Sequence, residues 1–419
     1  MKRQRLVAAS LAVGLVLTAC GGGGDDGAEE PVAEETGGEG EGEGATAAEG
    51  EPISVGFLGE LSGPFAIWGV HARNGMQMAI DEINAAGGVD GRPFELIERD
   101  TQGTPEEGVT AFRGLIERDG VVFAGGLISS DVALSASRIA EESQVPLFLV
   151  KAGADAILTQ DSRYTFRTCL SAGPMNIGLM AQFIQAEGIT RVGAIIADYA
   201  WGRSIEAAIN DQIATLDGVE VQIQVAPVPE TDFTTYLRQL EALDPEIIIA
   251  TGHPPGSGPI TSQAADLGFD AYVTGANSPL AAVMQNVGDS GIDRYVDYTC
   301  ADIASEEYYE LARRYQEQFD SFMEDDAVAG YGQVHMVAEA IEATGSAEPA
   351  DIAEYLRGNS FDLPGYAFDM EWTEWGEMSV AQPLLFVVRE QEAPEGVNPG
   401  NDWYPEVLFQ AEPLEPFEP

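Results

Sequence analysis

The chain has 419 residues, with 70 acidic residues against 20 basic ones and a formal net charge of −50 at pH 7. Such an acidic surface repels nucleic acid and anionic lipid, so we expect no nucleic acid partner. We interpret the acidity as adaptation to salty surroundings, where repulsion between like charges is screened. The length exceeds that of one typical core, and two domains are the default expectation.

The first residues indicate export. Positive residues at positions 2, 3 and 5 precede an apolar stretch over residues 6–17, which is too short to span a bilayer. The stretch ends in the sequence LTAC, which resembles the bacterial lipobox and ends at Cys20. This pattern predicts a signal peptide over residues 1–19 and a lipid on Cys20. The protein would then be extracytoplasmic, periplasmic or at the cell surface, and anchored to the membrane.

The next segment, residues 21–51, is rich in Gly and Glu and holds 11 acidic residues but no basic or aromatic residue. It cannot bury enough apolar surface to offset its ordering entropy. Together with Cys20, residues 20–51 are therefore predicted to form a lipidated, disordered acidic tether.

From residue 53 the pattern alternates between strand and helix. Regular alternation implies a mostly parallel sheet with helices on both faces. We expect strands at 53–61, 94–99, 121–124 and 146–150, and helices at 72–86, 105–118 and 131–143.

A second α/β run of similar size follows. We expect helices at 174–187, 203–216, 233–243 and 260–267, with strands at 191–197, 219–225, 246–250 and 271–274. Helices at 305–319, 327–344 and 349–357 and a strand at 383–388 complete the prediction. Two α/β lobes suggest a cleft, and ligands in such sheets bind beyond the carboxyl ends of the strands. That rule selects the loops at 62–69, 125–131, 151–155, 198–202, 252–258 and 275–278.

Two polar groups in these loops are candidates for binding an anion. Ser129 and Ser130 follow a strand and precede a helix, where their hydroxyls and amides either cap the helix or hold a carboxylate. Lys151 is one of only two lysines in the chain. We expect it at the mouth of the cleft, paired with an anionic ligand or with a carboxylate such as Asp155. Its removal is expected to leave stability nearly unchanged.

Aromatic residues occupy the corresponding loops. Trp68, Tyr199 and Trp201 either wall a ligand or pack between the lobes. His253, beside two prolines and a glycine, either donates to a ligand or has a structural role.

Enzyme and metal signatures are absent from the sequence. The three histidines show no metal-binding spacing, and there is no nucleophile elbow or phosphate loop. We therefore predict no catalysis, no metal and no cofactor. The two cysteines other than Cys20 are Cys169 and Cys300. Their spacing alone allows either a disulfide between them or two buried free thiols.

Three segments carry a family resemblance: GFLGELSGPFAIWGVHARNGMQMAIDEINAAGGVDGRPFELIERD at 56–100, GGLISSDVALSAS at 125–137 and RYTFRTCLSAG at 163–173. They resemble the leucine/isoleucine/valine-binding protein family, which are type I periplasmic solute-binding proteins of ABC transporters. The resemblance covers residues 53–375. It implies two doubly wound, mostly parallel α/β lobes joined by three crossover strands. Lobe 1 would comprise 52–168 plus 301–366, and lobe 2 would comprise 169–300 plus 367–419 with the C-terminal tail.

The resemblance also implies roles for particular residues. Ser129, with Ser130 beside it, matches the carboxylate-binding serine of the family. Trp68 and Trp201 match aromatic pocket positions, with Tyr199 near the second. Gly153 lies in a loop whose backbone holds the ligand. Cys169 and Cys300 fall beside neighbouring crossovers, which implies a disulfide.

Two positions depart from the family pattern. Ala154 stands where amino-acid binders commonly have Thr, with Lys151 and Asp155 nearby. Asn277 stands where they have an acidic residue for the ligand ammonium. A small carboxylate solute is therefore a safer expectation than leucine itself.

The expected function is capture of a branched-chain-amino-acid-like or other small carboxylate solute by flytrap closure, followed by delivery to an ABC permease in the membrane. Asn277 and the two tryptophans leave a binder of an amide, of urea or of an aromatic acid as an alternative. A ligand-sensing subunit without transport is a further alternative.

Overall fold

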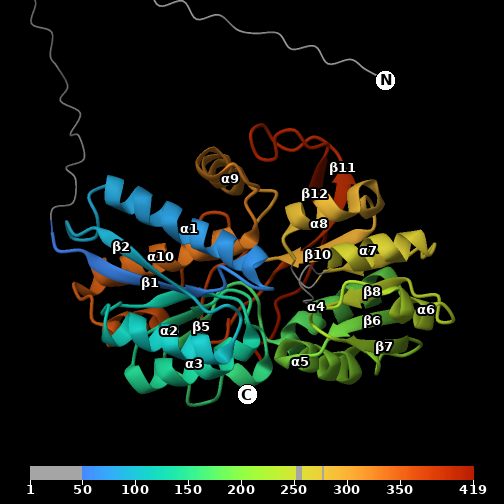
Figure 1. The fold of residues 1–419 in the computed structure, drawn as a ribbon, viewed down its shortest axis with the longest axis horizontal. Coiled ribbons are helices and arrows are strands. Elements are labelled where there is room, and N and C mark those ends of the chain that lie inside the picture. The colour runs from blue at the N-terminus through green and yellow to red at the C-terminus, as the bar shows by residue number, and fades with distance from the viewer. Residues whose placement is uncertain (1–49, 252–256, 276–277) are drawn as a thin grey trace, which may run out of the picture. The chain divides into compact units, whose positions relative to one another are not determined.

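The chain builds two separate sheets that are each covered by helices (Figure 1). We describe them from a computed structural model, which covers residues 50–251, 257–275 and 278–419. The prediction of an α/β fold with two lobes is confirmed. Cys20, His253 and Asn277 lie outside the described residues.

The first sheet has five parallel strands in the order β2-β1-β3-β4-β5. Its elements, with the helices associated with it, are β1 Ile53–Gly59, α1 Ala66–Ala85, β2 Phe94–Asp100, α2 Pro105–Glu117, β3 Ala124–Leu127, α3 Ser130–Ser143, β4 Leu147–Leu149, β5 Thr165–Arg167, α9 Glu306–Phe319, α10 Asp325–Thr344 and α11 Pro349–Gly358.

The second sheet has seven strands in the order β12-β11-β10-β9-β8-β6-β7. Its strands β6 to β10 run parallel, whereas β11 and β12 are antiparallel to their neighbours. Its elements are α4 Gly173–Glu187, β6 Arg191–Ala197, α5 Ala200–Ala208, β7 Glu220–Ala226, α6 Thr234–Leu240, β8 Ile247–Ala250, α7 Ser257–Asp266, β9 Tyr272–Thr274, α8 Leu280–Val287, β10 Tyr295–Thr299, β11 Leu384–Glu390 and β12 Trp403–Gln410.

The buried strands carry apolar side chains on each of their two faces, because helices cover both faces of the sheet. In β4, Phe148 packs into the cluster that contains the apolar residues of α1 and α10. Leu147 and Leu149 point the other way and pack with residues of α2 and α3. Because successive side chains of a strand point to opposite faces, this one strand contributes to two hydrophobic clusters.

Several elements differ from the sequence prediction. The strand expected at 121–124 is β3 at Ala124–Leu127, and α8, β10 and β12 were not predicted. β10 contains Asp297, whose carboxylate accepts from the Tyr295 hydroxyl at 2.6 Å, so a polar residue is buried within a strand. β12 contains Pro405, which a strand tolerates here because β12 forms the edge of its sheet.

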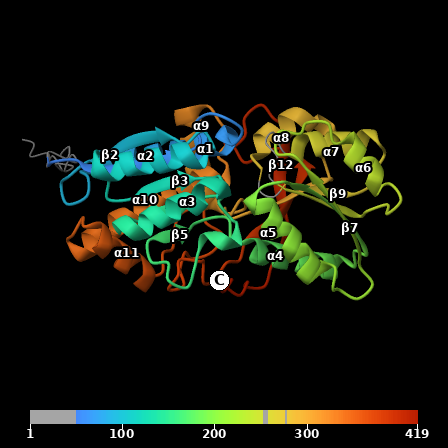
Figure 2. The same cartoon turned by 60° about the horizontal axis from the view of Figure 1, so that its bottom comes forward.

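The chain passes between the sheets after β5, after β10 and before β11. The structure joins Cys169 and Cys300, which follow β5 and β10, by a disulfide. Residues 372–378, which the sequence analysis assigns to lobe 2, contact the first sheet: the Arg167 N–H donates to the Gly376 carbonyl at 3.0 Å. The C-terminus lies near the boundary between the two sheets (Figure 2). Within the described residues, no helix is both long and apolar enough to cross a bilayer.

Candidate functional site

A cavity lies where the carboxyl ends of strands from both sheets meet. Six of its lining residues come from the loops that the sequence selected, and four of these, Trp68, Lys151, Tyr199 and Trp201, are predicted site residues. Phe65, Ile128 and Leu170 complete the lining among the described residues. The enclosed space is about 20 Å³, which is close to the size of one water site. The side chains therefore stand close together across the lobes.

The cavity wall is mainly aromatic. The ring centroid of Phe65 lies 6.0 Å from that of Trp68 and 5.7 Å from that of Tyr199. Trp68 and Trp201 are almost fully buried. Phe65 is not among the predicted site residues, although it lies in the predicted loop at 62–69. The feature that could have identified Phe65 as a site residue is an aromatic side chain in a loop predicted to line the cleft.

Gly153 brings a loop of the first lobe against α5 of the second. A Cβ built on Gly153 would lie 2.3 Å from a ring atom of Trp201, so no larger side chain fits without movement. The Gly173 N–H also donates to the Gly153 carbonyl at 3.1 Å. Gly153 thus sets how closely Trp201 approaches this loop.

The start of α3 holds two of the predicted serines. Ser129 is the N-cap, and its hydroxyl accepts from the Val132 N–H at 3.5 Å. The Ser130 hydroxyl accepts from the Ala154 N–H at 3.2 Å, which ties α3 to the loop after β4. Both serines are buried. The structure brings Ser129, Ser130 and Ala154 together, and binding of a ligand carboxylate by Ser129 stays a prediction.

Glu60, which the sequence analysis did not select, lies directly beneath this helix start. Its carboxylate accepts from the N–H groups of Ile128 at 3.1 Å and Ser129 at 3.3 Å, and from the Thr101 hydroxyl at 3.0 Å. Burial raises the pKa of the Glu60 carboxyl to about 7, although these hydrogen bonds work in the opposite direction. Glu60 also contributes to the raised pKa of Tyr199, whose main cause is burial.

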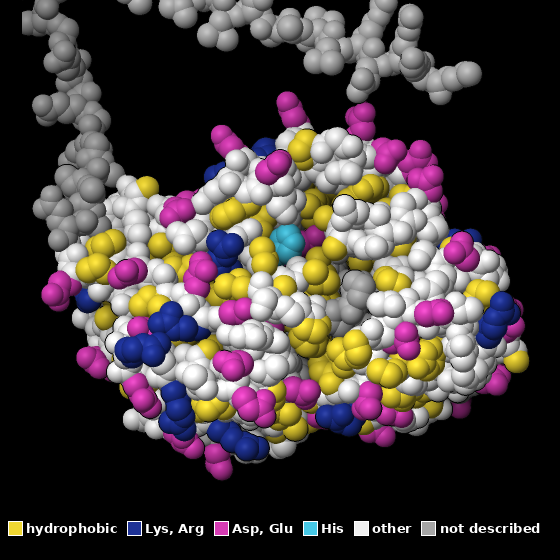
Figure 3. Space-filling model, viewed as in Figure 1, with side chains coloured by type: hydrophobic (Ala, Val, Ile, Leu, Met, Phe, Trp, Pro, Cys, Tyr) yellow, Lys and Arg dark blue, Asp and Glu magenta, His cyan; other side chains and the backbone are white. Residues whose placement is uncertain are grey.

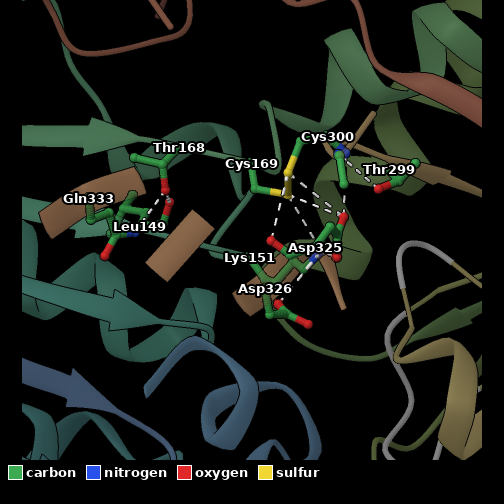
Figure 4. The surroundings of a disulfide bond; sticks show 10 residues. Leu149, Lys151, Thr168, Cys169, Thr299, Cys300, Asp325, Asp326 and Gln333 are labelled. Atoms are coloured by element: carbon green, nitrogen blue, oxygen red, sulfur yellow. Dashed lines mark hydrogen bonds and ion pairs between the residues drawn. A yellow bond between two sulfur atoms is a disulfide. The ribbon is translucent and has the colours of Figure 1, made fainter. Parts of the chain in front are cut away.

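Lys151 is not at an open cleft mouth but is buried against α10 (Figure 4). Its ammonium lies 2.8 Å from the Asp325 carboxylate and 3.6 Å from that of Asp326. The predicted alternative partner, Asp155, instead accepts from the Ser204 hydroxyl at 2.7 Å. Burial raises the pKa of Asp326 well above its ordinary range. Of the two carboxylates, that of Asp325 lies closer to the Lys151 ammonium.

The residue before α10 connects the two lobes. The Glu324 carboxylate accepts from the N–H groups of Leu280 and Ala281, both at 2.9 Å, at the start of α8. α10 packs on α1 of the first lobe, whereas α8 packs on α7 of the second. Burial raises the pKa of Glu324 to about 8. Glu324 is thus an acidic contact between the lobes.

A buried ion pair supports the loop after β4 from below. The Arg167 guanidinium donates to the Glu377 carboxylate at 2.9 Å, to the Ala154 carbonyl at 2.7 Å and to the Ala152 carbonyl. Arg167 is fully buried. Its planar fork suits several fixed acceptors, and it holds the loop that carries Gly153 and Ala154.

The disulfide lies beside the Lys151 pair. A sulfur of Cys169 is 3.3 Å from the Asp325 carboxylate, and the Cys300 N–H donates to the same carboxylate at 3.4 Å (Figure 4). Cys169, Cys300 and Asp325 form the one group of three metal-ligand types found among the described residues. Because the two sulfurs are bonded to each other, they are not thiolates that bind a metal.

Comparisons with known proteins agree with this architecture. A family model described as periplasmic binding protein matches residues 52–388. The leucine-, isoleucine-, valine-, threonine-, and alanine-binding protein of Pseudomonas aeruginosa is 26% identical over 327 residues, which are 75% of this chain and 84% of that protein.

Solved structures share the fold at low sequence identity. The leucine-binding protein LivK of Thermotoga maritima is 22% identical with a TM-score of 0.71, over 87% of this chain and 99% of that one. A solute-binding protein of an ABC transporter from R. palustris, in complex with 4-hydroxybenzoate, is 21% identical with a TM-score of 0.73, over 87% and 98%.

Proposed function

Because this chain belongs to the periplasmic binding protein family, we propose that it is the solute-binding lipoprotein of an ABC importer. Proteins of this family are extracytoplasmic and bind solutes without catalysis, and this chain is not an enzyme. Its partners would be a small solute and the permease subunits that receive it. The lipoprotein assignment is supported by the short apolar stretch at 6–17 and the sequence LTAC that ends at Cys20.

The observation that carries the proposal is the cavity shared by the two lobes. Trp68 and Lys151 come from the first lobe, and Tyr199 and Trp201 from the second. Because the enclosed space is about that of one water, the lobes must part to admit a solute, and a solute that touches both lobes then favours their closing around it. Closure would then present the loaded form to the permease.

The proposed solute is a small carboxylate with an apolar body. Among the described lining residues Lys151 is the only charged one, and a solute carboxylate would have to share or compete for an ammonium that lies 2.8 Å from Asp325. The apolar body would lie against the aromatic rings. A branched-chain amino acid fits this description, and the relative from Pseudomonas aeruginosa is named for such solutes.

An aromatic acid is the second candidate. Four rings line the cavity, from Phe65, Trp68, Tyr199 and Trp201, and flat solutes stack well on such surfaces. The related structure from R. palustris contains 4-hydroxybenzoate. The aromatic wall therefore favours this class over amides and urea, which need more polar partners.

A thermal-shift screen tests the proposed function. The probes are L-leucine, L-isoleucine, benzoate, 4-hydroxybenzoate, butyramide and urea. We expect one or more carboxylates to raise the melting temperature, because a ligand at 100 times its dissociation constant stabilises by about 2.7 kcal/mol. Trp201→Ala should abolish that shift, whereas Val380→Ala, at an exposed position, should retain it. Shifts with amides or urea alone would contradict a carboxylate solute.

A further inference from the structure

Two helices of the second lobe begin without a capping side chain of their own. The first N–H groups of a helix have no partner within the helix, and the side chain at the N-cap position commonly accepts from them. Tyr199 and Pro279 stand at the N-cap positions of α5 and α8, and neither makes such a hydrogen bond. These two helix starts are therefore open to acceptors from elsewhere in the chain.

Acidic side chains of the first lobe occupy both helix starts. Asp131 lies in the first turn of α3, and its carboxylate accepts from the Ala200 N–H, at the first residue of α5, at 3.3 Å. The two oxygens of the Glu324 carboxyl group accept from the N–H groups of Leu280 and Ala281, one each, at 2.9 Å. Each of these helices of the second lobe is thus capped by the first lobe.

The capping side chains serve the opposite lobe and not their own helix. Glu324 is the N-cap residue of α10, yet its side chain makes no capping hydrogen bond to α10. α3 and α5 contact each other between the lobes (Figure 2). A further contact there joins the Ser204 hydroxyl of α5 to the Asp155 carboxylate of the first lobe at 2.7 Å. Separation of the lobes would break all of these hydrogen bonds together.

We propose that Asp131 and Glu324 are positioning residues that favour closure of the lobes before a solute arrives, because each caps a helix of the opposite lobe. Neither is among the described residues that line the solute cavity. They therefore act on the equilibrium between open and closed lobes and not on the solute itself. This inference rests on the proposed function, because it concerns the closure by which a solute would be captured. A larger closed fraction gives a lower apparent dissociation constant.

Hydrogen exchange in the solute-free protein tests whether the two caps are coupled through the lobes. The N–H groups of Leu280 and Ala281 should exchange in proportion to how often the lobes open. Asp131→Ala removes the cap of the other helix, α5. We expect exchange at Leu280 and Ala281 to become about fivefold faster, which is the typical effect of one lost cap on an equilibrium. ¹H–¹⁵N spectra recorded after transfer into D₂O measure these rates.

Two further variants separate coupling between the lobes from a loss of stability. Asp131→Asn keeps an acceptor oxygen, so Leu280 and Ala281 should exchange at wild-type rates. Thr104→Ala also removes a cap, but Thr104 and its donor, the Glu107 N–H at 3.4 Å, both lie in the first lobe. This variant should lower the melting temperature and leave exchange at Leu280 and Ala281 unchanged.

The reciprocal variant, Glu324→Gln, keeps the proposal open to refutation if Asp131→Ala does not fold. It retains one acceptor oxygen but places an NH₂ group against the second N–H of α8. The Ala200 N–H, at the start of α5, should then exchange faster, although Glu324 caps the other helix. Exchange at the distant helix start that stays at the wild-type rate, in either variant, would overturn the proposal. An effect of Thr104→Ala as large as that of Asp131→Ala would overturn it as well.

The exchange experiment contains no solute, so its outcome is independent of the solute screen. Coupled exchange without any response in the screen would keep the role of the two caps and reject the proposed solute class. A response in the screen with uncoupled exchange would keep the proposed function and reject the role of the caps.

Discussion

At the scale of single residues, Lys151 shows how a side chain in a predicted site can also be structural. Its side chain is 4% exposed, and those of Asp325 and Asp326 are 8% and 1% exposed. A buried ion pair stabilises a fold little more than a pair of apolar side chains of similar size. Removing one partner, however, leaves a buried charge without compensation. The expectation that Lys151 can be removed without loss of stability is therefore replaced by the opposite one.

Lys151→Met should lower the free energy of unfolding by about 3–5 kcal/mol, because Asp325 then keeps a buried charge without its ammonium. Urea unfolding monitored by tryptophan fluorescence measures this change. Adding Asp325→Asn to the variant should recover part of the loss, since the uncompensated charge is removed as well.

Arg113→Ala is the control for Lys151→Met. Arg113 makes an exposed ion pair with Glu117, and such pairs contribute about 0–1 kcal/mol. A Lys151→Met variant that is as stable as Arg113→Ala would show that the buried pair does not support the fold.

At the scale of elements, Glu324 couples the start of α8 to the start of α10. The pKa of its carboxyl is raised from 4.5 to about 8, mainly by burial. Because the folded state holds this proton more tightly than the unfolded state, the contribution of Glu324 to stability is fully present below pH 4.5. It is lost as the pH rises toward 8.

Glu324→Gln should therefore have a shallower dependence of stability on pH between 5 and 8. One coupled proton changes the free energy of unfolding by at most about 1.4 kcal/mol per pH unit. Urea unfolding at pH 5, 6, 7, 8 and 9 measures the slope for both proteins. Glu117→Gln, at an exposed position, should keep the wild-type slope. Equal slopes for Glu324→Gln and the wild-type protein would show that Glu324 does not hold this proton.

The elements around the site were largely predictable, because alternating strands and helices mark the carboxyl ends where ligands gather. That rule placed Trp68, Tyr199 and Trp201 in loops that the structure brings to one cavity. The partner of Lys151 was not predictable, since Asp325 is 174 residues away in sequence. Glu60 was missed because an acidic residue after a strand usually lies in solvent, and burial cannot be read from one position.

At the scale of the whole molecule, negative charge dominates. Of the 70 acidic residues 59 lie in residues 52–419, where only 17 basic residues lie, which leaves a net charge of −42. Acidic side chains are spread over the face in Figure 3, and basic side chains are fewer. Mutual repulsion between these charges destabilises the folded state and is screened by salt.

The melting temperature should therefore rise by several degrees between 50 mM and 1 M sodium chloride at pH 7, because the Debye length falls from more than 10 Å to about 3 Å. Differential scanning calorimetry measures the change. Sucrose that is matched in osmolality serves as the control for effects other than screening. A melting temperature that stays constant or falls with salt would contradict dominant surface repulsion.

The buried position of Lys151 has a practical consequence for chemical labelling. Lys2 and Lys151 are the two lysines of the chain, so Lys151 carries the one ε-amino group within residues 50–419. That amine is shielded by both lobes, and acylating reagents reach it only when the lobes separate. Its rate of modification therefore reports how often the lobes open, and because acylation removes the ammonium charge, the modified protein should lose stability as Lys151→Met does.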